Sequence, residues 1–297
     1  MNIGLIQIDG KMPNIALMKI SQYHKSIGNS IEWIKYFNKY DIVYTSQIFN
    51  FSTPDTTYIN SGEIIKGGTG ISLKKELPKD IESCDPDYSI YNCNYSIQMF
   101  SRGCVRKCPF CVVNEKEGRI RPVKHMKLNP KGKHIEIFDN NFFANPEWKS
   151  AINLLLKWKQ KVNFHGIDIR IMNEEQAFYL NKLRHKKQIH IAWDNPKDNL
   201  LPKIKEVIKY IKPYKIMCYV LIGYWSNQDQ DEYRVTELDK LGITPFVMPF
   251  NKKDKYQADY ATFVNKRWIY KACNGNFKLY NRKNFKTINE SQYKLEI

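Results

Sequence analysis

The sequence has no long run of apolar residues. Its longest apolar stretches, residues 217–224 and 151–156, fall well short of the roughly 20 residues that a helix needs to cross a bilayer. The first residues lack the charged start, apolar stretch and cleavage site of a signal peptide. We therefore expect a cytoplasmic protein with no membrane partner.

No cysteine precedes position 84, and the seven cysteines are an odd number. A chain of 297 residues does not need disulfides to stabilise its core, so a reducing compartment is expected. The sequence also lacks repeats and low-complexity segments. With 42% hydrophobic residues it is able to bury a core, which excludes an intrinsically disordered chain.

Arginine is scarce, since only nine of the 47 basic residues are arginine. Against 30 acidic residues the basic excess gives a net charge of +17. An excess of this size favours acidic partners such as nucleic acid. A lysine-rich surface that only contacts water is the other interpretation, and both stay open.

The first 75 residues predict a small α/β domain, and residues 76–94 predict a linker. The linker segment carries prolines and acids without the period of a helix or a strand. The expected elements of the domain are a strand at 3–8, a helix at 14–27, strands at 30–34 and 41–44, and a strand near 63–66 that ends in a glycine turn at 67–70.

Residues 95–255 alternate short apolar runs with segments of helical period, a pattern typical of a parallel sheet. The fold class expected is α/β, with a partial (β/α)6 barrel of the TIM type preceded by a small Rossmann-like α/β domain. Functional groups would then lie at the carboxyl ends of the strands. An open doubly wound sheet is the alternative, and residues 256–297 predict a C-terminal helix and tail. The expected strands are 96–100, 134–138, 163–169, 188–193, 215–222 and 244–248, and the expected helices 148–158, 174–184, 201–211, 230–241 and 256–270.

Three cysteines follow the first of these strands at a C-x3-C-x2-C spacing, as Cys104, Cys108 and Cys111. Thiolates at this spacing suit a soft metal site, either zinc or an iron-sulfur cluster. A structural zinc needs a fourth ligand, and no paired C-x2-C follows. The residues weighed for that role are Cys84, Cys93, His125 and His134.

The segment resembles the radical SAM superfamily, whose loop after the first strand carries C-x3-C-x-aromatic-C. Here Cys104, Cys108, Phe110 and Cys111 match that pattern, and the resemblance covers about residues 95–255. It implies one [4Fe-4S] cluster held by the three cysteines, with S-adenosylmethionine on the fourth iron. The cluster would cleave S-adenosylmethionine reductively to a 5'-deoxyadenosyl radical, which abstracts hydrogen from an unidentified substrate. An electron donor such as flavodoxin or ferredoxin is also implied.

The same resemblance directs attention to the ends of the next strands. Asp139, Asn140 and Asn141 stand where the family holds the methionine amino group, although this chain lacks the family's glycines there. Asp168 and Arg170 end the third strand as S-adenosylmethionine candidates. A polar turn at the first position and an internal ion pair at the second are the alternatives.

Two further strand ends complete the candidate site. Asp194 and Asn195 are candidates to bond the ribose hydroxyls, with helix capping as the alternative. Gly223 follows the fifth strand, where the family packs adenine and where a glycine allows close approach. An ordinary buried strand is the alternative there.

An α/β unit ahead of a radical SAM core is similar to the cobalamin-binding group of that superfamily. Lys11 stands where that group has its cobalt-binding histidine, and a protonated lysine cannot ligate cobalt, so bound cobalamin is possible but not favoured. Cobalamin-dependent methyl transfer is therefore one alternative function. A zinc-stabilised nucleic-acid-binding module is the other. The substrate expected is a small molecule, a nucleotide or RNA.

Overall fold

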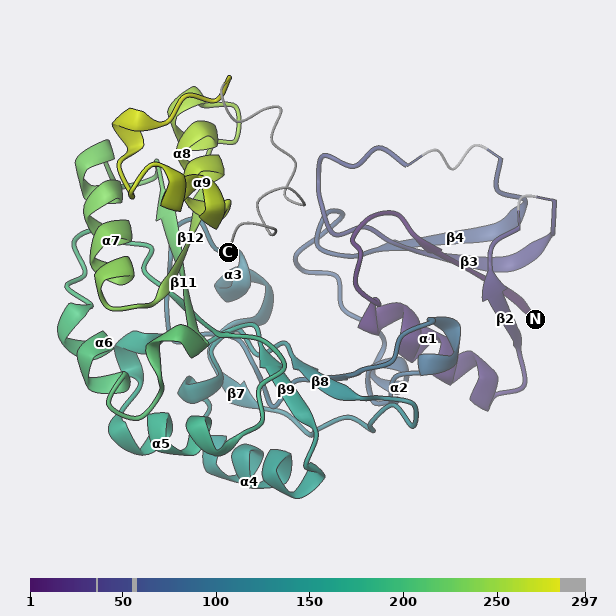
Figure 1. Ribbon diagram of the computed structural model, residues 1–297. Coiled ribbons are helices and arrows are strands. Elements are labelled where there is room, and N and C mark those ends of the chain that lie inside the picture. Colours follow the sequence, from purple (N-terminus) through teal and green to yellow (C-terminus); the bar gives the residue numbers. More distant parts are fainter. Residues whose placement is uncertain (36, 55–57, 284–297) are drawn as a thin grey trace. The chain divides into compact units, whose positions relative to one another are not determined.

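The computed structural model describes residues 1–35, 37–54 and 58–283. The chain is a mixed α/β protein with parallel sheets and forms two compact units, Met1–Asn140 and Asn141–Ile297 (Figure 1). The expected linker and the first two expected strands of the core therefore both fall inside the first unit.

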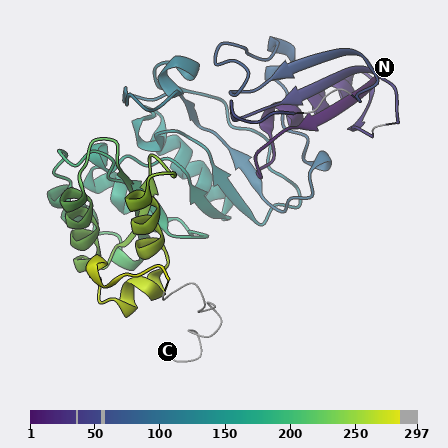
Figure 2. The same ribbon diagram turned by 90° about the horizontal axis from the view of Figure 1, so that it is seen from above.

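The first unit begins with a parallel sheet of four strands in the order β2-β1-β3-β4. Helix α1 connects β1 to β2 and lies against the sheet (Figure 2). Asn14 caps this helix by accepting a hydrogen bond from the backbone of Leu17 at 3.2 Å. All five predicted elements are confirmed, as β1 (Asn2–Gln7), α1 (Ile15–Ser26), β2 (Ser30–Trp33), β3 (Tyr40–Ser46) and β4 (Ser61–Gly67).

The predicted linker at residues 76–94 is wrong, because this segment is folded into the first unit. It forms helix α2 (Lys79–Glu82) and the 3-10 helix η1 (Tyr88–Ile90). Ile81 of α2 is buried in one cluster with Leu5 and Leu17. A helix of one turn is too short to show an apolar period, so the sequence pattern could not reveal it.

Asp87 joins this segment to α1. It accepts hydrogen bonds from the Ser21 hydroxyl and the Lys25 ammonium, each at 2.7 Å. Burial raises the pKa of Asp87, but the bonds from Lys25, Ser89 and Ser21 outweigh burial and lower that pKa to about 2. A carboxylate with a depressed pKa stabilises the fold above its ordinary pKa of about 4, and this contribution is lost as pH falls toward 2.

The substitution Asp87→Asn is expected to lower the free energy of unfolding by about 1–2 kcal/mol at pH 7. The difference from the unsubstituted protein should shrink as the pH falls from 4 toward 2, because Asp87 itself then becomes neutral. Urea unfolding over this pH series measures it, with the exposed Asp80→Asn as control. A difference that stays constant with pH would contradict the charge argument.

The rest of the first unit contains the first two strands predicted for the core. β5 and β8 pair in parallel, and all four residues of β8 are buried. Two of them, His134 and Glu136, form a side-chain hydrogen bond at 2.8 Å. A short antiparallel ribbon follows β5. The elements are β5 (Ser96–Gln98), β6 (Ser101–Arg102), α3 (Val113–Glu117), β7 (Arg121–Pro122) and β8 (His134–Ile137).

The second unit repeats strand and helix in the predicted order, and three of the four strands and the five helical regions predicted there are confirmed. The strand predicted over 163–169 is wrong in its bounds, because the strand ends at Phe164 and Asp168 caps a 3-10 helix over Ile169–Ile171, so Asp168 and Arg170 do not end a strand. β10, β11 and β12 form a parallel sheet in that order. The strands are β9 (Lys161–Phe164), β10 (Ile189–Ala192), β11 (Ile216–Ile222) and β12 (Thr244–Pro249). The helices are α4 (Trp148–Trp158), α5 (Glu174–Lys182), α6 (Leu201–Val207), α7 (Gln228–Lys240), α8 (Lys255–Asn265) and α9 (Arg267–Ala272), with 3-10 turns η2 (Phe142–Ala144), η3 (Ile169–Ile171), η4 (Pro213–Lys215) and η5 (Phe277–Leu279).

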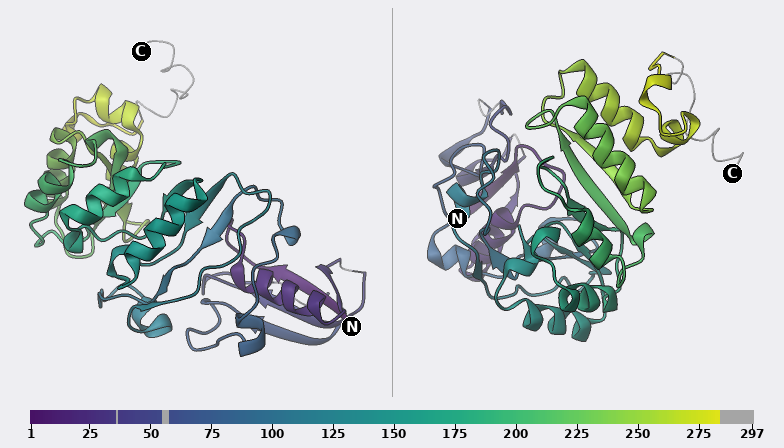
Figure 3. Two further views of the ribbon diagram at one scale, coloured as in Figure 1. Left: turned by 90° about the horizontal axis from the view of Figure 1, so that it is seen from below. Right: turned by 90° about the vertical axis from the view of Figure 1, so that its left-hand side faces the viewer.

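Burial in this unit follows the strand period. β11 buries every second residue, from Ile216 through Cys218 and Val220 to Ile222. Helices α7 and α8 pack along β11 and β12 (Figure 3). The helix predicted over 256–270 is divided into α8 and α9, and the tail beyond residue 283 lies outside the described residues.

The longest described helix, α7, has 13 residues, and none of the helices in the described part of the chain has the length and hydropathy that a bilayer crossing requires.

Candidate functional site

The cysteine motif lies on an irregular loop, residues 103–112, that runs from β6 to helix α3. Cys104 and Cys108 are half-buried, Cys111 is exposed, and none of the three forms a disulfide. The Cys104 sulfur accepts a hydrogen bond from the backbone of Arg106 at 3.3 Å. The backbone of Cys111 donates to the Cys108 carbonyl at 3.0 Å. The loop thus contains a local turn at Cys108–Cys111, and β6, which precedes the loop, pairs antiparallel with β7, which follows α3.

Glu117, at the end of α3, holds both sides of this loop together. One of its carboxylate oxygens accepts from the Gly103 backbone at 2.8 Å and from the Asn140 amide at 2.7 Å. The other oxygen pairs with Arg102 at 2.9 Å. One carboxylate therefore joins the start of the cysteine loop to Asn140, three positions after the end of β8.

Gly103 starts the loop with a backbone that other residues rarely adopt. Its φ is +86°, and a Cβ at this position would lie 2.4 Å from the Arg119 carbonyl oxygen. Gly118 has a similar φ of +73°, but a Cβ there would meet nothing within 4 Å. A side chain at position 103 would therefore cause both backbone strain and steric overlap, whereas one at position 118 would cause backbone strain alone.

Gly103→Ala is expected to lower the free energy of unfolding by about 2–4 kcal/mol, because strain and overlap add. Gly118→Ala should lower it by only about 1–2 kcal/mol, through strain alone. Urea unfolding measures both values. Equal losses in the two variants would show that the loop yields to a side chain at position 103.

The three candidate residues beyond the end of β8, Asp139, Asn140 and Asn141, have different environments. Asp139 is buried and accepts from the Phe100 backbone at 3.0 Å and the Ser101 hydroxyl at 2.5 Å. Burial raises the pKa of Asp139. Asn141 is only 1% exposed, yet neither its side-chain nitrogen nor its oxygen has a hydrogen-bond partner among the described residues. A buried amide without a partner is costly, so this side chain has capacity to bind a polar ligand.

The structure does not gather the cysteines into a metal site. Within residues 1–35, 37–54 and 58–283, no group of three or more His, Cys, Asp or Glu side chains is positioned to hold a metal ion. His134, weighed above as a fourth zinc ligand, is instead paired with Glu136 at 2.8 Å. The chemistry of the donor set fits an iron-sulfur cluster, since three accessible thiols stand on one loop with a backbone N–H on one sulfur.

In the second unit, Arg170 and Asp168 pair with each other. The Arg170 Nε donates to Asp168 at 2.7 Å, and its Nη1 lies 3.2 Å from Asp198. Burial lowers the pKa of Arg170, but the bonds to Asp168 and Asp198 outweigh burial and raise that pKa. The internal ion pair left open above is therefore present, and it connects the segment after β9 to the segment after β10.

Asp194 and Asn195 follow β10. Burial raises the pKa of Asp194, and the positive charges of Arg170 and Arg234 oppose that rise. Asn195 accepts from the Lys197 backbone at 3.0 Å, so it forms a turn and not a helix cap. The second unit thus brings Asp168, Arg170 and Asp194 into one charged group in the segments after β9 and β10.

Gly223 follows β11 with a φ of +78°, and a Cβ here would lie 2.2 Å from the Gln257 side chain. The close approach predicted at this glycine is therefore made by Gln257 of α8. Gln257 also accepts from the Asn251 backbone at 2.8 Å, which fixes the segment after β12.

Phe110, the aromatic of the cysteine motif, is half-buried.

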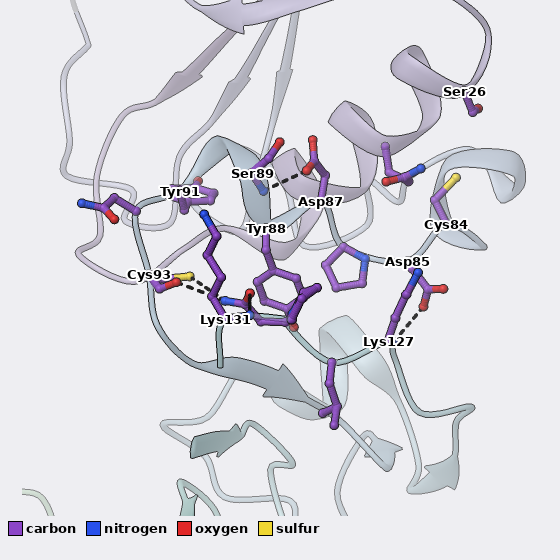
Figure 4. A pocket seen from close by; sticks show the side chains of 16 residues that line it. Ser26, Cys84, Asp85, Asp87, Tyr88, Ser89, Tyr91, Cys93, Lys127 and Lys131 are labelled. Carbon is purple, nitrogen blue, oxygen red and sulfur yellow. Dashed lines mark hydrogen bonds between the residues drawn. The ribbon is translucent and has the colours of Figure 1, made fainter. Parts of the chain in front are cut away.

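A separate pocket of about 760 Å³ lies in the first unit (Figure 4). Tyr88, Cys93 and Lys131 line it together with the end of α1, and the Lys127 backbone donates to Asp85 at 2.9 Å on its rim. Its lining residues precede β5 and β8, whereas the candidate residues of this unit follow those strands. The pocket and the cysteine loop therefore belong to opposite strand ends.

Two residues that position this site were missed by the sequence reasoning, Glu117 and Arg234. Glu117 bonds to Gly103 and Asn140, which are distant in sequence, so no local spacing marks it. Arg234 has distant partners in the Trp193 and Leu221 carbonyls, and its i, i+3 spacing from Asp231 and the scarcity of arginine were the signals available for it. No protein-family model matches the chain, and no curated protein matches it.

Proposed function

We propose that the chain is a radical SAM enzyme that uses one [4Fe-4S] cluster and S-adenosylmethionine. The observation that carries this proposal is the C-x3-C-x2-C motif on a loop beyond the first strand of a repeated parallel β/α series. Three thiols from one short loop would hold three irons of such a cluster and would leave the fourth iron open to S-adenosylmethionine.

We also propose the finer architecture that this function requires. The six strands β5, β8, β9, β10, β11 and β12 would form a partial (β/α)6 barrel, and β1 to β4 with α1 a small Rossmann-like domain. The parallel pairing within each sheet and the alternation of strand and helix support both assignments. A partial barrel places its functional residues at strand carboxyl ends, where the candidate residues occur in the sequence.

The roles of the chain's own residues follow from their contacts. Cys104, Cys108 and Cys111 would hold the cluster, which supplies the electron that cleaves the sulfonium bond of S-adenosylmethionine. Glu117 fixes the start of the cysteine loop through Gly103. Binding has to draw the three thiols together, as is usual where a metal completes its own site.

The residues proposed to bind S-adenosylmethionine differ in whether their side chains are already hydrogen-bonded within the protein. Asn141 has an unpartnered buried amide, which makes it the strongest candidate to bond the methionine group. Asp194 supplies a carboxylate for the ribose hydroxyls. Asp139, Asn140 and Arg170 are already bonded within the protein and would act by positioning their neighbours.

The proposed enzyme works in the cytoplasm with a flavodoxin or ferredoxin as electron donor. All seven cysteines are free thiols, as a reducing compartment would keep them. We propose hydrogen abstraction without cobalamin, because Lys11 stands at the position of the cobalt-binding histidine. The substrate is a small molecule, a nucleotide or RNA.

Anaerobic reconstitution with iron and sulfide tests the proposal. The expected result is four irons per chain and an electron paramagnetic resonance signal of the reduced protein that shifts when S-adenosylmethionine is added. Formation of 5'-deoxyadenosine and methionine would show turnover. Protein that retains zinc and takes up no iron would sink the proposal in favour of the zinc-stabilised module.

A further inference from the structure

The loop after β3 presents large apolar side chains to solvent. Phe49 and Phe51 are 45% and 77% exposed, and Ile48 is 37% exposed. The two phenylalanine rings stack with centroids 5.1 Å apart and an angle of 14° between their planes. We call Ile48, Phe49 and Phe51 the aromatic platform. Since Phe49 covers one face of the Phe51 ring, the opposite face is available for a further stacked ring.

The aromatic platform is held in place by hydrogen bonds to its backbone. Asp9, after β1, accepts from the backbones of Ile48 at 2.7 Å and Phe49 at 2.9 Å, and from the Ser52 hydroxyl at 2.7 Å. From inside the loop, Gln47 donates to the carbonyls of Phe49 at 2.7 Å and Ser52 at 3.0 Å. These bonds therefore fix residues 47–52 without burying the apolar side chains of that segment, which favours a surface that a partner covers.

The segments next to the aromatic platform in the fold carry more basic than acidic residues. The segments that carry the platform or bond to it are residues 9–12, 47–53 and 66–76. They contain four lysines, and their only acidic residues are Asp9 and Glu76. Asp9 is already bonded to the loop, and these bonds lower its pKa although burial opposes them. The exposed lysines are Lys11, Lys66, Lys74 and Lys75.

A further contact connects these segments to the cysteine loop. Lys116 of helix α3 donates to the Thr69 hydroxyl at 3.1 Å. Thr69 lies in the glycine turn, where Gly70 donates to the Gln47 carbonyl at 2.9 Å. A molecule bound on the aromatic platform would therefore lie on the same unit as the cysteines and be connected to them through two short contacts.

We propose that the aromatic platform binds unpaired bases of single-stranded nucleic acid, with the neighbouring lysines on its phosphates. Flat rings in a basic setting are the recognition chemistry of single strands, since every base has a face that stacks. A bilayer is the other partner that apolar and basic groups attract. The ordered loop and the parallel ring stack favour a flat ligand over lipid. This proposal concerns binding and does not depend on the cluster.

Fluorescence anisotropy with a labelled 12-nucleotide RNA of mixed sequence tests it, using the full chain. The same sequence as DNA and as an RNA duplex provides the comparison. The double substitution Phe49→Ala/Phe51→Ala is expected to weaken single-strand binding at least 10-fold. Phe178→Ala is the matched control, because Phe178 is 46% exposed and belongs to the other unit. This variant should bind the single strand with the affinity of the unsubstituted chain.

The lysines give a second readout. In a plot of the logarithm of the association constant against the logarithm of the salt concentration, Lys74→Gln/Lys75→Gln should make the negative slope shallower by about 1.4, because two phosphate contacts are lost. The proposal is overturned if the unsubstituted chain binds no single strand. It is also overturned if duplex binds as tightly and the double phenylalanine variant binds like the unsubstituted chain. Flotation with phosphatidylcholine and phosphatidylserine vesicles that depends on Phe49 and Phe51, without RNA binding, would assign the surface to a membrane instead.

Discussion

Cys108→Ala is expected to leave the reconstituted protein without a [4Fe-4S] cluster and without the signal that responds to S-adenosylmethionine. Two remaining thiols cannot hold a cluster that already lacks a fourth protein ligand. Formation of 5'-deoxyadenosine should fall at least 100-fold. Cys104→Ala and Cys111→Ala should give the same result, because the proposal assigns one iron to each of the three thiols.

The chain contains a suitable control in Cys93. This thiol is half-buried, and burial raises its pKa. It lines the pocket of Figure 4 and precedes β5, so Cys93→Ala should retain the iron and the signal. Iron content, electron paramagnetic resonance and product formation measure all four variants. Loss of iron in Cys93→Ala together with the others would indicate a different ligand set, and full activity in Cys108→Ala would refute the cluster assignment.

Most helices and strands could be predicted from the sequence because each carries its own local pattern of apolar residues. β11 buries every second residue and α4 begins and ends where its apolar period does, so each element carries its own pattern. The folded segment around Ile81 was missed because its burial comes from Leu5 and Leu17 of the first sheet and helix. A single helical turn has no period of its own, and only the tertiary contact defines it.

The residues of the candidate site also fall into two groups, those that a local sequence pattern marks and those that only a tertiary contact defines. The cysteines were found by spacing, because all three belong to one loop. His24 is buried and bonds to Tyr44 and Asn29, and burial lowers its pKa, yet no local pattern in the sequence indicates these partners. Glu117 contacts Asn140 across 23 positions, and no sequence pattern encodes such a pair. Residues that position a site through distant bonds become visible only once the chain is folded.

Arg234→Met is expected to lower the free energy of unfolding by about 3–5 kcal/mol. Arg234 is 1% exposed and pairs with the fully buried Asp231 at 2.7 Å. It also donates to the carbonyls of Trp193 at 2.7 Å and Leu221 at 2.9 Å, which lie at the ends of β10 and β11. The substitution leaves the Asp231 carboxylate buried without its cation and these carbonyls without a donor.

The partly exposed pair of Arg267 and Asp239 is the comparison, because its side chains are 32% and 39% exposed, whereas those of Arg234 and Asp231 are 1% and 0% exposed. Arg267→Met should cost no more than about 1 kcal/mol, since solvent replaces the lost charge. Urea unfolding at pH 7 measures both variants. Equal losses would mean that the interior around Asp231 admits water. A large loss confined to Arg234→Met would show that one buried guanidinium holds two strand ends together, beside the Asp194 carboxylate that the proposed function requires in place.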